Sequence, residues 1–374
     1  MFDFNLKNYG YLELIICILL NVAGLVFIQS SVKNEVNTLI SQLLISIGSL
    51  IICIGISLLN LKRFMSRPNM FLILAIAILF IGYVFGTAYG RNSRRWISIP
   101  IVNYAIQPSE FVKLLTILFL SKYIEKKDFF INRIGELAKV IGLFSMPFLL
   151  IFFQPNLSSS LILFFIFIAM LFASKLKLRW FVGGGFIILA LYLLVFFSVK
   201  YGFIYNLPML RDYQKNRIVS FFEPQEKDDT RYQQENSIIA IGSGKLIGKG
   251  INNDSAQSVK NGNWLAEAQN DFIFAVVGEE IGFLGSTIII LLYVFLIISC
   301  FSIAGKQREQ YKKLICVGVG AWISIQTFIN IGVATNLIPN TGIPLPFFSQ
   351  GGSSLLSIYM AIGFVLNIKR EVRV

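Results

Sequence analysis

The sequence contains no histidine in its 374 residues, and only 14% of them are charged. The absence of histidine excludes Ser-His-Asp triads, histidine-ligated zinc and histidine general bases, so proton transfer would fall to Asp, Glu, Lys or Tyr. Cysteine is also scarce. The four cysteines all lie inside apolar runs, which favours buried packing over a disulfide framework.

What the sequence has instead is hydrophobicity: 55% of the residues are hydrophobic, and the mean hydropathy is +0.70. Apolar runs near or above the length that spans a bilayer recur along the chain. They fall at about 10–29, 40–59, 70–89, 106–123, 137–153, 157–174, 180–199, 271–301, 313–335 and 352–368. We therefore predict an all-α polytopic membrane protein with about ten transmembrane helices, forming a single membrane domain over residues 1–374.

Lysine and arginine predict the orientation, because the cytoplasmic loops of membrane proteins are enriched in both. With the N-terminus inside, seventeen of these residues lie on the inner side, whereas the short outer loops hold only Lys33, Arg91, Arg94 and Arg95. Both termini are thus predicted in the cytoplasm, with the long segment 200–270, between the seventh and eighth helices, outside. The net charge of +13 then reflects topology and anionic lipid, so nucleic acid is not an expected partner.

The stretch Trp264–Gly285 carries the strongest functional signal, because a polar segment there gives way to an apolar helix with Asp271 at the junction. An aspartate at that place can be a helix N-cap and nothing more, since its oxygen accepts from the free N–H groups of the first turn. Glu279 and Glu280 follow about two turns further along the same apolar helix, where uncompensated charge is costly and usually functional. Three acids on one helix therefore indicate a functional site in this stretch, and the N-cap alternative for Asp271 stays open at this point.

The outer loop 90–107 is cationic, with Arg95 and Trp96 in it, and it leads into a helix that opens QPSEFVKL. Such a loop favours an anionic ligand; alternatively, its arginines contact lipid phosphates and Trp96 is an interfacial residue. In the helix, Glu110 and Lys113 are spaced i, i+3, so they share a face and can pair. Pairing lowers the cost of both charges in the membrane, and it is either mutual compensation alone or part of a site.

Two further outer segments are rich in glycine or proline. The glycines between Gly242 and Gly250, with Lys245 and Lys249 among them, offer backbone N–H groups to a phosphate, although the pattern is not a Walker motif. The last outer loop, 336–351, contains several prolines and glycines but no lysine or arginine. That composition is typical of a re-entrant or tightly folded loop, whose backbone must be covered by protein or water.

Five motifs, taken together and in this order, resemble those of the SEDS family of bacterial cell-wall proteins, to which RodA and FtsW belong. They are RRWISIP with IQPSEFVKL, QPNLSSS, YQQENSIIAIGSGKLIGKG, AEAQNDFIFAVVGEEIGFLG and NIGVATNLIPNTGIPLPFFSQGGSS. The resemblance covers nearly the whole chain and implies ten helices with cytoplasmic termini. It also implies a peptidoglycan glycosyltransferase that polymerises lipid II on the outer face of the bacterial cytoplasmic membrane. Some segments are closer to RodA and others to FtsW, so elongation and division both stay open.

The resemblance implies roles for single residues as well. The family's catalytic aspartate falls on Asp271, and its membrane-embedded Glu and Lys fall on Glu110 and Lys113. The chain departs from the usual family pattern at Asn156, where Asp is common, and at Gln350, where Tyr is common. The complete set of expected substrate-binding residues is Arg95, Trp96, Gln107, Ser109, Glu110, Lys113, Gln154, Lys249, Glu279, Ser349, Gly351 and Gly352.

No metal site is predicted, although a divalent cation such as Mg²⁺ or Mn²⁺, held by Glu110 or another carboxylate, would help a pyrophosphate to leave. The resemblance implies lipid II, a class B penicillin-binding protein (a transpeptidase) and other elongasome or divisome membrane proteins as partners. Two other classes stay open. Embedded acids together with Lys113 also suit a flippase or another transporter of lipid-linked precursors, and a non-enzymatic scaffold is a third possibility.

Overall fold

The computed structural model describes residues 8–32, 36–86, 96–99, 104–127, 130–154, 156–203, 215, 229–252, 265 and 268–371. The prediction made for Arg95 lies outside these residues, as does much of the predicted outer segment 200–270.

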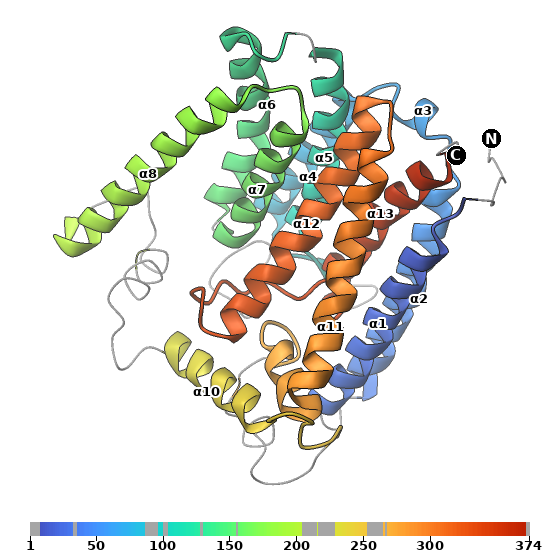
Figure 1. Ribbon diagram of the computed structural model, residues 1–374, viewed down its shortest axis with the longest axis vertical. Helices are drawn as coiled ribbons and strands as arrows, with labels where there is room; N and C mark the ends of the chain where they lie inside the picture. Colours follow the sequence, from blue (N-terminus) through green and yellow to red (C-terminus); the bar gives the residue numbers. More distant parts are fainter. Residues whose placement is uncertain are drawn as a thin grey trace.

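Helices form most of the described chain, as Figure 1 shows. They are α1 (Tyr11–Ser31), α2 (Val36–Ser57), α3 (Leu61–Phe64), α4 (Asn69–Phe85), α5 (Pro108–Lys127), α6 (Ile134–Phe153), α7 (Leu157–Ala173), α8 (Leu178–Lys200), α10 (Asp229–Ser243), α11 (Ile273–Gly305), α12 (Gln310–Ala334) and α13 (Gly352–Arg370). Each predicted apolar run coincides with one of these helices, which confirms the all-α polytopic fold. Within the described ranges, six helices, α1, α2, α6, α11, α12 and α13, are long and apolar enough to cross a membrane. The count of ten spans stays a prediction.

A small β-hairpin accompanies the helices. Strand β1 (Ile97–Ile99) pairs antiparallel with β2 (Tyr104–Ile106), and Ile97 lies opposite Ile106. Isoleucine and tyrosine favour extended backbone, which accounts for strands in this outer loop. Because β2 ends directly before Gln107 and α5, the hairpin lies at the N-terminal end of that helix.

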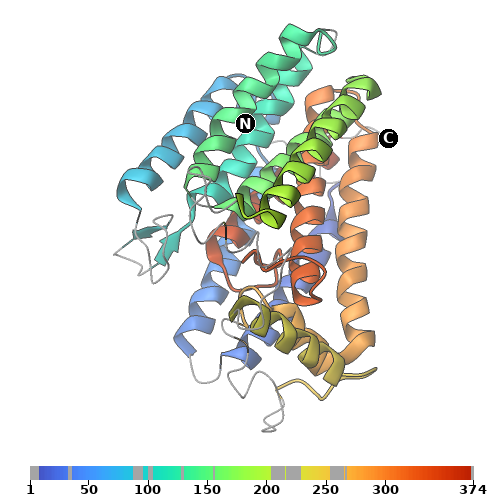
Figure 2. The same ribbon diagram turned by 90° about the vertical axis from the view of Figure 1, so that its left-hand side faces the viewer.

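Helices α12 and α13 form the centre of the bundle, and the other membrane helices surround them (Figure 1, Figure 2). The apolar window of α13 is 83% buried inside the protein and that of α12 78% buried, against 28% for α2 and for α6. Large apolar side chains on the peripheral helices, such as Leu44 and Ile73, are exposed on the surface of the bundle, as expected of lipid-facing positions. Buried polar residues are found on the central helices and also on α1, α2, α5 and the start of α7.

Helix α11 is broken at Gly282, whose φ of 64° and ψ of −163° are not helical. The sequence required a tilt, a bend or a protrusion here, because the apolar run 271–301 is longer than the hydrocarbon core is thick. Gly278, Gly282 and Gly285 were the candidate points for close packing or bending. The break is closed by segment 245–250: the N–H of Phe283 donates to the carbonyl of Lys245 (2.9 Å), and that of Leu284 to Leu246 (3.0 Å). The backbone N–H groups freed by the kink are thus hydrogen-bonded to protein and not exposed to lipid.

The contact between segment 245–250 and α11 corrects the interpretation of the glycine-rich run as a phosphate site. The N–H groups of Lys249 and Gly250 donate to the carbonyl oxygens of Glu279 (2.9 Å) and Glu280 (3.0 Å). A methyl group at Gly248 would lie 2.1 Å from the Glu280 carbonyl oxygen, so glycine is needed there for the close approach to α11. These backbone donors stabilise the broken helix and are not available to a phosphate.

The loop between α12 and α13 folds into the bundle instead of extending from it (Figure 2). Leu345 is 1% exposed and Phe348 is fully buried. The Asn21 amide of α1 donates to the carbonyl of Phe347 (3.0 Å), and Gly24 leaves room for the backbone of Phe348. Residues 340–351 are therefore held inside the bundle, in contact with α1.

Candidate active site

A cavity of about 470 Å³ lies where α5, α7, α11 and α13 begin. Its lining comes from α2, the hairpin, these four helix starts and the inward-folded loop. The lining residues are Thr38, Ser41, Gln42, Ile45, Trp96, Ala105, Gln107, Glu110, Asn156, Ser158, Ser159, Ile162, Asn270, Asp271, Gly342, Ile343, Pro344, Gln350, Gly351, Gly352, Ser353 and Ser354. Because backbone N–H groups at helix starts carry partial positive charge, the cavity is suited to an anionic group.

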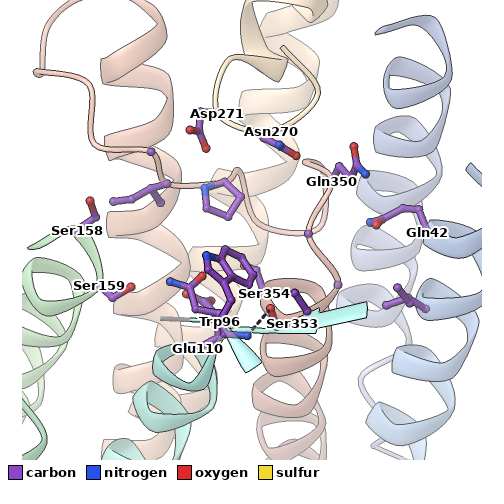
Figure 3. Close-up of a pocket in the computed structure, with 18 of the residues that line it drawn as sticks. Gln42, Trp96, Glu110, Ser158, Ser159, Asn270, Asp271, Gln350, Ser353 and Ser354 are labelled. Atoms are coloured by element: carbon purple, nitrogen blue, oxygen red, sulfur yellow. Dashed lines mark hydrogen bonds between the residues drawn. The ribbon is translucent and has the colours of Figure 1, made fainter. Parts of the chain in front are cut away.

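Asp271 lies at the upper side of this cavity in Figure 3, above Trp96 and Glu110. Helix α11 begins at Ile273 with Phe272 as its N-cap residue (φ −113°, ψ 21°), so Asp271 precedes the cap position. The interpretation of Asp271 as the N-cap is therefore wrong. Its carboxylate lies beside Gly342, where a methyl group would come within 3.3 Å of Oδ2.

The backbone of Asp271 is held by Asn330 of α12. The Asn330 side-chain amide donates to the carbonyl oxygens of both Asp271 (2.9 Å) and Ile343 (2.8 Å), and Asn330 is 1% exposed. One side chain thus joins the start of α11 to the inward-folded loop. Sequence reasoning missed this residue, although an asparagine inside the apolar run 313–335 was a signal.

Glu110 lines the cavity, with Lys113 buried behind it. The Lys113 Nζ and Glu110 Oε1 atoms are 2.8 Å apart, which confirms the predicted pairing, and neither residue is more than 4% exposed. Lys113 also donates to Gln326 (3.4 Å) and lies 4.7 Å from the centre of the Trp322 ring. Gln326 donates in turn to the Pro344 carbonyl (2.9 Å), so the ion pair supports the loop beside the cavity.

Asn156 is the N-cap of α7, since its side-chain oxygen accepts from the N–H of Ser159 (3.3 Å). Its amide nitrogen also donates to Ser109 (2.9 Å), which ties the start of α7 to that of α5. A neutral asparagine does both, so no acid is required here. Gln154 donates to the Leu79 carbonyl of α4 (2.6 Å) and is not among the lining residues.

The other predicted residues divide into two groups. Trp96, Gln107, Gly351 and Gly352 line the cavity with Asp271 and Glu110. Other members of the predicted set do not line it; these are Ser109, Lys113, Gln154, Lys249, Glu279 and Ser349. Lys249 pairs with Glu279 (2.7 Å), and the Ser349 hydroxyl accepts from the N–H of Leu345 (2.8 Å).

Several cavity residues were not predicted, chiefly on α2 and at the starts of α7 and α13. They include Thr38, Ser41, Gln42, Ser158, Ser159, Asn270, Gln350, Ser353 and Ser354. The spacing of Thr38, Ser41, Gln42 and Ile45 places them on one face of α2, but the sequence does not say which face meets the cavity.

The carboxylates in the described lining of the cavity are Asp271 and Glu110. Among the described residues there is no group of three or more His, Cys, Asp or Glu that could hold a metal ion. Within these ranges, a divalent cation in the cavity would therefore depend on two carboxylates and on ligands supplied by the substrate.

Comparison with known proteins agrees with this arrangement. A family model described as cell cycle protein, covering FtsW, RodA and SpoVE, matches residues 11–374. The chain belongs to the FtsW/RodA/SpoVE family. Stage V sporulation protein E of Bacillus subtilis is 36% identical over 82% of this chain and 79% of its own length. The probable peptidoglycan glycosyltransferase FtsW of Wigglesworthia glossinidia brevipalpis is 34% identical over 81% of this chain and 76% of its own length.

Solved structures of FtsW/RodA/SpoVE-like chains share the fold. The rod shape determining protein RodA of Thermus thermophilus matches with a TM-score of 0.71 at 24% identity, over 97% of each chain. A chain from a peptidoglycan synthase complex, described for its coordination of polymerization and crosslinking, matches with a TM-score of 0.79 at 25% identity. That match covers 97% of this chain and 98% of the other. The family resemblance that the five motifs carry is therefore confirmed.

Proposed function

We propose that this protein is a peptidoglycan glycosyltransferase that polymerises lipid II into glycan strands. The observation that carries the proposal is the position of Asp271, whose carboxylate lines a 470 Å³ cavity at the outer ends of the predicted spans. Family membership and relatives named as glycosyltransferases support the same activity. The whole chain, 1–374, acts as one membrane domain in this proposal.

The chemistry requires a base and a stabilised leaving group. The 4-hydroxyl of one sugar attacks the anomeric carbon of a polyprenyl-pyrophosphate-linked sugar; Asp271 takes the hydroxyl proton as the new C–O bond forms. The bond to the pyrophosphate then breaks, and the leaving group departs with the electron pair. The starts of α5, α7 and α13 present partial positive charge to this cavity, and such charge stabilises a departing anion.

The predicted cations have different places in this mechanism. Lys113 lies behind Glu110, so it acts by holding that carboxylate and the adjoining loop. Lys249 serves as the counter-ion of Glu279 at the broken helix. Arg95, outside the described residues, remains the proposed cation for the pyrophosphate, supplied by the loop that carries Trp96.

Orientation and partners complete the proposal. The lysine and arginine distribution supports a multi-pass protein of the bacterial cytoplasmic membrane, with both termini in the cytoplasm and the cavity opening outward. We infer a class B penicillin-binding protein as transpeptidase partner, docked on lipid-facing residues of α11 and α12 together with segment 200–270. Co-purification that survives deletion of that segment and repacking of those helices would contradict this docking surface.

Purified protein supplied with lipid II tests the proposed activity. We expect glycan polymers from the wild-type protein, with its transpeptidase partner present, and none from Asp271→Asn. A transporter would instead move lipid II between the leaflets of vesicles without making polymer, and a scaffold would do neither. Absence of polymer from wild type under these conditions would overturn the enzyme proposal.

A further inference from the structure

Gln42 of α2 is a buried polar side chain that the proposed mechanism does not use. It is 3% exposed and lines the cavity. Figure 3 shows its side chain extending from α2 toward the interior of the pocket, on the side opposite Ser158 and Ser159. Within the described part of the chain, no hydrogen bond engages the side-chain amide of Gln42, although its backbone carbonyl accepts from Ser46 (2.8 Å).

Neither polar atom of the Gln42 side chain is among the fully enclosed atoms that lack a hydrogen-bond partner, so the amide keeps access to the cavity. An amide with no hydrogen bond to protein leaves its donor and acceptor groups available to whatever fills the adjoining space. Such a group in a core position suggests a role other than folding. Here it faces a cavity large enough for a small-molecule ligand. The unused hydrogen-bonding capacity of Gln42 therefore points to a ligand that fills the cavity.

The wall around Gln42 indicates the chemistry of that ligand. Thr38, Ser41 and Gln42 lie on one face of α2, and none of them is charged. No lysine or arginine lines the cavity within the described ranges. This wall accordingly suits a neutral polar group and not a phosphate, which needs cations or free backbone N–H groups.

We propose that the α2 wall is the subsite for the acceptor sugar and that Gln42 binds its acetamido group. An acetamido group carries one N–H donor and one carbonyl acceptor, which pair with the carbonyl and the amino group of a glutamine side chain. The assignment rests on the proposed function, because Asp271 can accept the proton of the attacking hydroxyl only if the acceptor sugar lies in this cavity. Gln42 is then a specificity-determining residue.

Gln42→Met separates this role from a structural one. Methionine has a similar length and is apolar, so the change removes the hydrogen-bonding groups of the amide without leaving a large void. A purely structural glutamine would lose stability on this substitution. If Gln42 serves only to bind a ligand, the Gln42→Met protein loses no stability, and its thermal unfolding temperature stays equal or rises. Gln29→Met, at an exposed position near the outer end of α1, is the matched control.

The experiment compares two ligands on full-length protein in nanodiscs. One is lipid II, and the other is an analogue that carries a hydroxyl in place of the acetamido group on its non-reducing sugar. Wild type and Gln29→Met should bind the analogue on the order of tenfold more weakly than lipid II, as expected for a lost neutral hydrogen-bonded pair. Gln42→Met should bind both ligands equally.

Two results would overturn the inference: undiminished discrimination by Gln42→Met, or a loss of binding that parallels a fall in its unfolding temperature. Because binding is measured without turnover, the outcome is independent of the polymerisation assay. Failure of wild type to make polymer would overturn the proposed function alone, whereas the binding ratio decides the role of Gln42.

Discussion

The carboxylate of Asp271 lies beside Gly342, where a methyl group on the α-carbon would be 3.3 Å from Oδ2. Gly342 also has a φ of +67°, a conformation that side chains disfavour. Two separate segments of the chain thus meet at the proposed base, and the small size of one residue sets the position of the other.

Gly342→Ala should impair polymerisation more than it impairs folding. The backbone penalty of a left-handed conformation is about 1–2 kcal/mol for a residue other than glycine. The added methyl group also forces the Asp271 carboxylate to move by a few tenths of an ångström, and misplacement of a reacting group lowers the rate. Polymer yield and unfolding temperature would both be measured.

Gly202→Ala is the control for that variant, because Gly202 has a φ of +74° and nothing lies within 4 Å of the added carbon. It should show a similar loss of stability with normal polymerisation. Equal activity of the two variants would contradict a steric role of Gly342 at Asp271.

Asp271→Asn should abolish polymer formation while folding and lipid II binding stay near wild type. The change keeps the size of the side chain but removes the base, a loss typically worth 10²–10⁴-fold in rate. Single-turnover polymerisation by detergent-stable protein measures it. Activity within a few-fold of wild type would remove Asp271 from the mechanism.

Asn330→Leu should lower both stability and turnover. It leaves the carbonyl oxygens of Asp271 and Ile343 without their shared donor, at a cost of about 1–3 kcal/mol for each buried group. It also frees the start of α11 from the loop that carries Gly342. We therefore expect kcat to fall further than the loss of folded protein explains.

The matched control is Asn367→Leu. Asn367 of α13 donates to the carbonyls of Ile56 (3.0 Å), Ser57 (3.1 Å) and Leu59 (2.7 Å), and none of these residues lines the cavity. Its loss should reduce stability while the folded fraction keeps its kcat. If both variants lose kcat alike, Asn330 has no special connection with Asp271.

Lys113→Ala should strongly destabilise the protein, because removing one partner of a buried ion pair costs about 3–5 kcal/mol. The double variant Glu110→Gln/Lys113→Met leaves no uncompensated charge and should recover much of the unfolding temperature without recovering polymerisation. If the double variant recovered both its unfolding temperature and its polymerisation, the two charges would serve only to neutralise each other in the membrane. Lys139→Ala, which breaks an exposed i, i+3 pair with Glu136, should leave the unfolding temperature nearly unchanged.

The outcomes for particular residues show how far sequence reasoning reached. The Glu110 and Lys113 pairing followed from their spacing, since residues three apart on a helix are neighbours. The length of the apolar run 271–301 required a tilt, a bend or a protrusion, and only the structure placed a break at Gly282. By contrast, the glycine-rich run around Gly248 was misread, because spacing alone does not reveal that its N–H groups pair with the carbonyls of α11.

The sequence by itself determined the membrane class, the places of the apolar helices and the candidacy of Asp271, because these depend on local hydrophobicity, charge and order along the chain. Tertiary structure alone decided which polar residues meet in the cavity. Asn330 and Gly342 contact Asp271 from two separate segments, and Gln42 lines the same cavity from a third; the packing of α2, α12 and the inward-folded loop brings them together. Such long-range contacts depend on which faces of the helices pack together, and the one-dimensional pattern of a nearly uniform apolar run does not specify that choice.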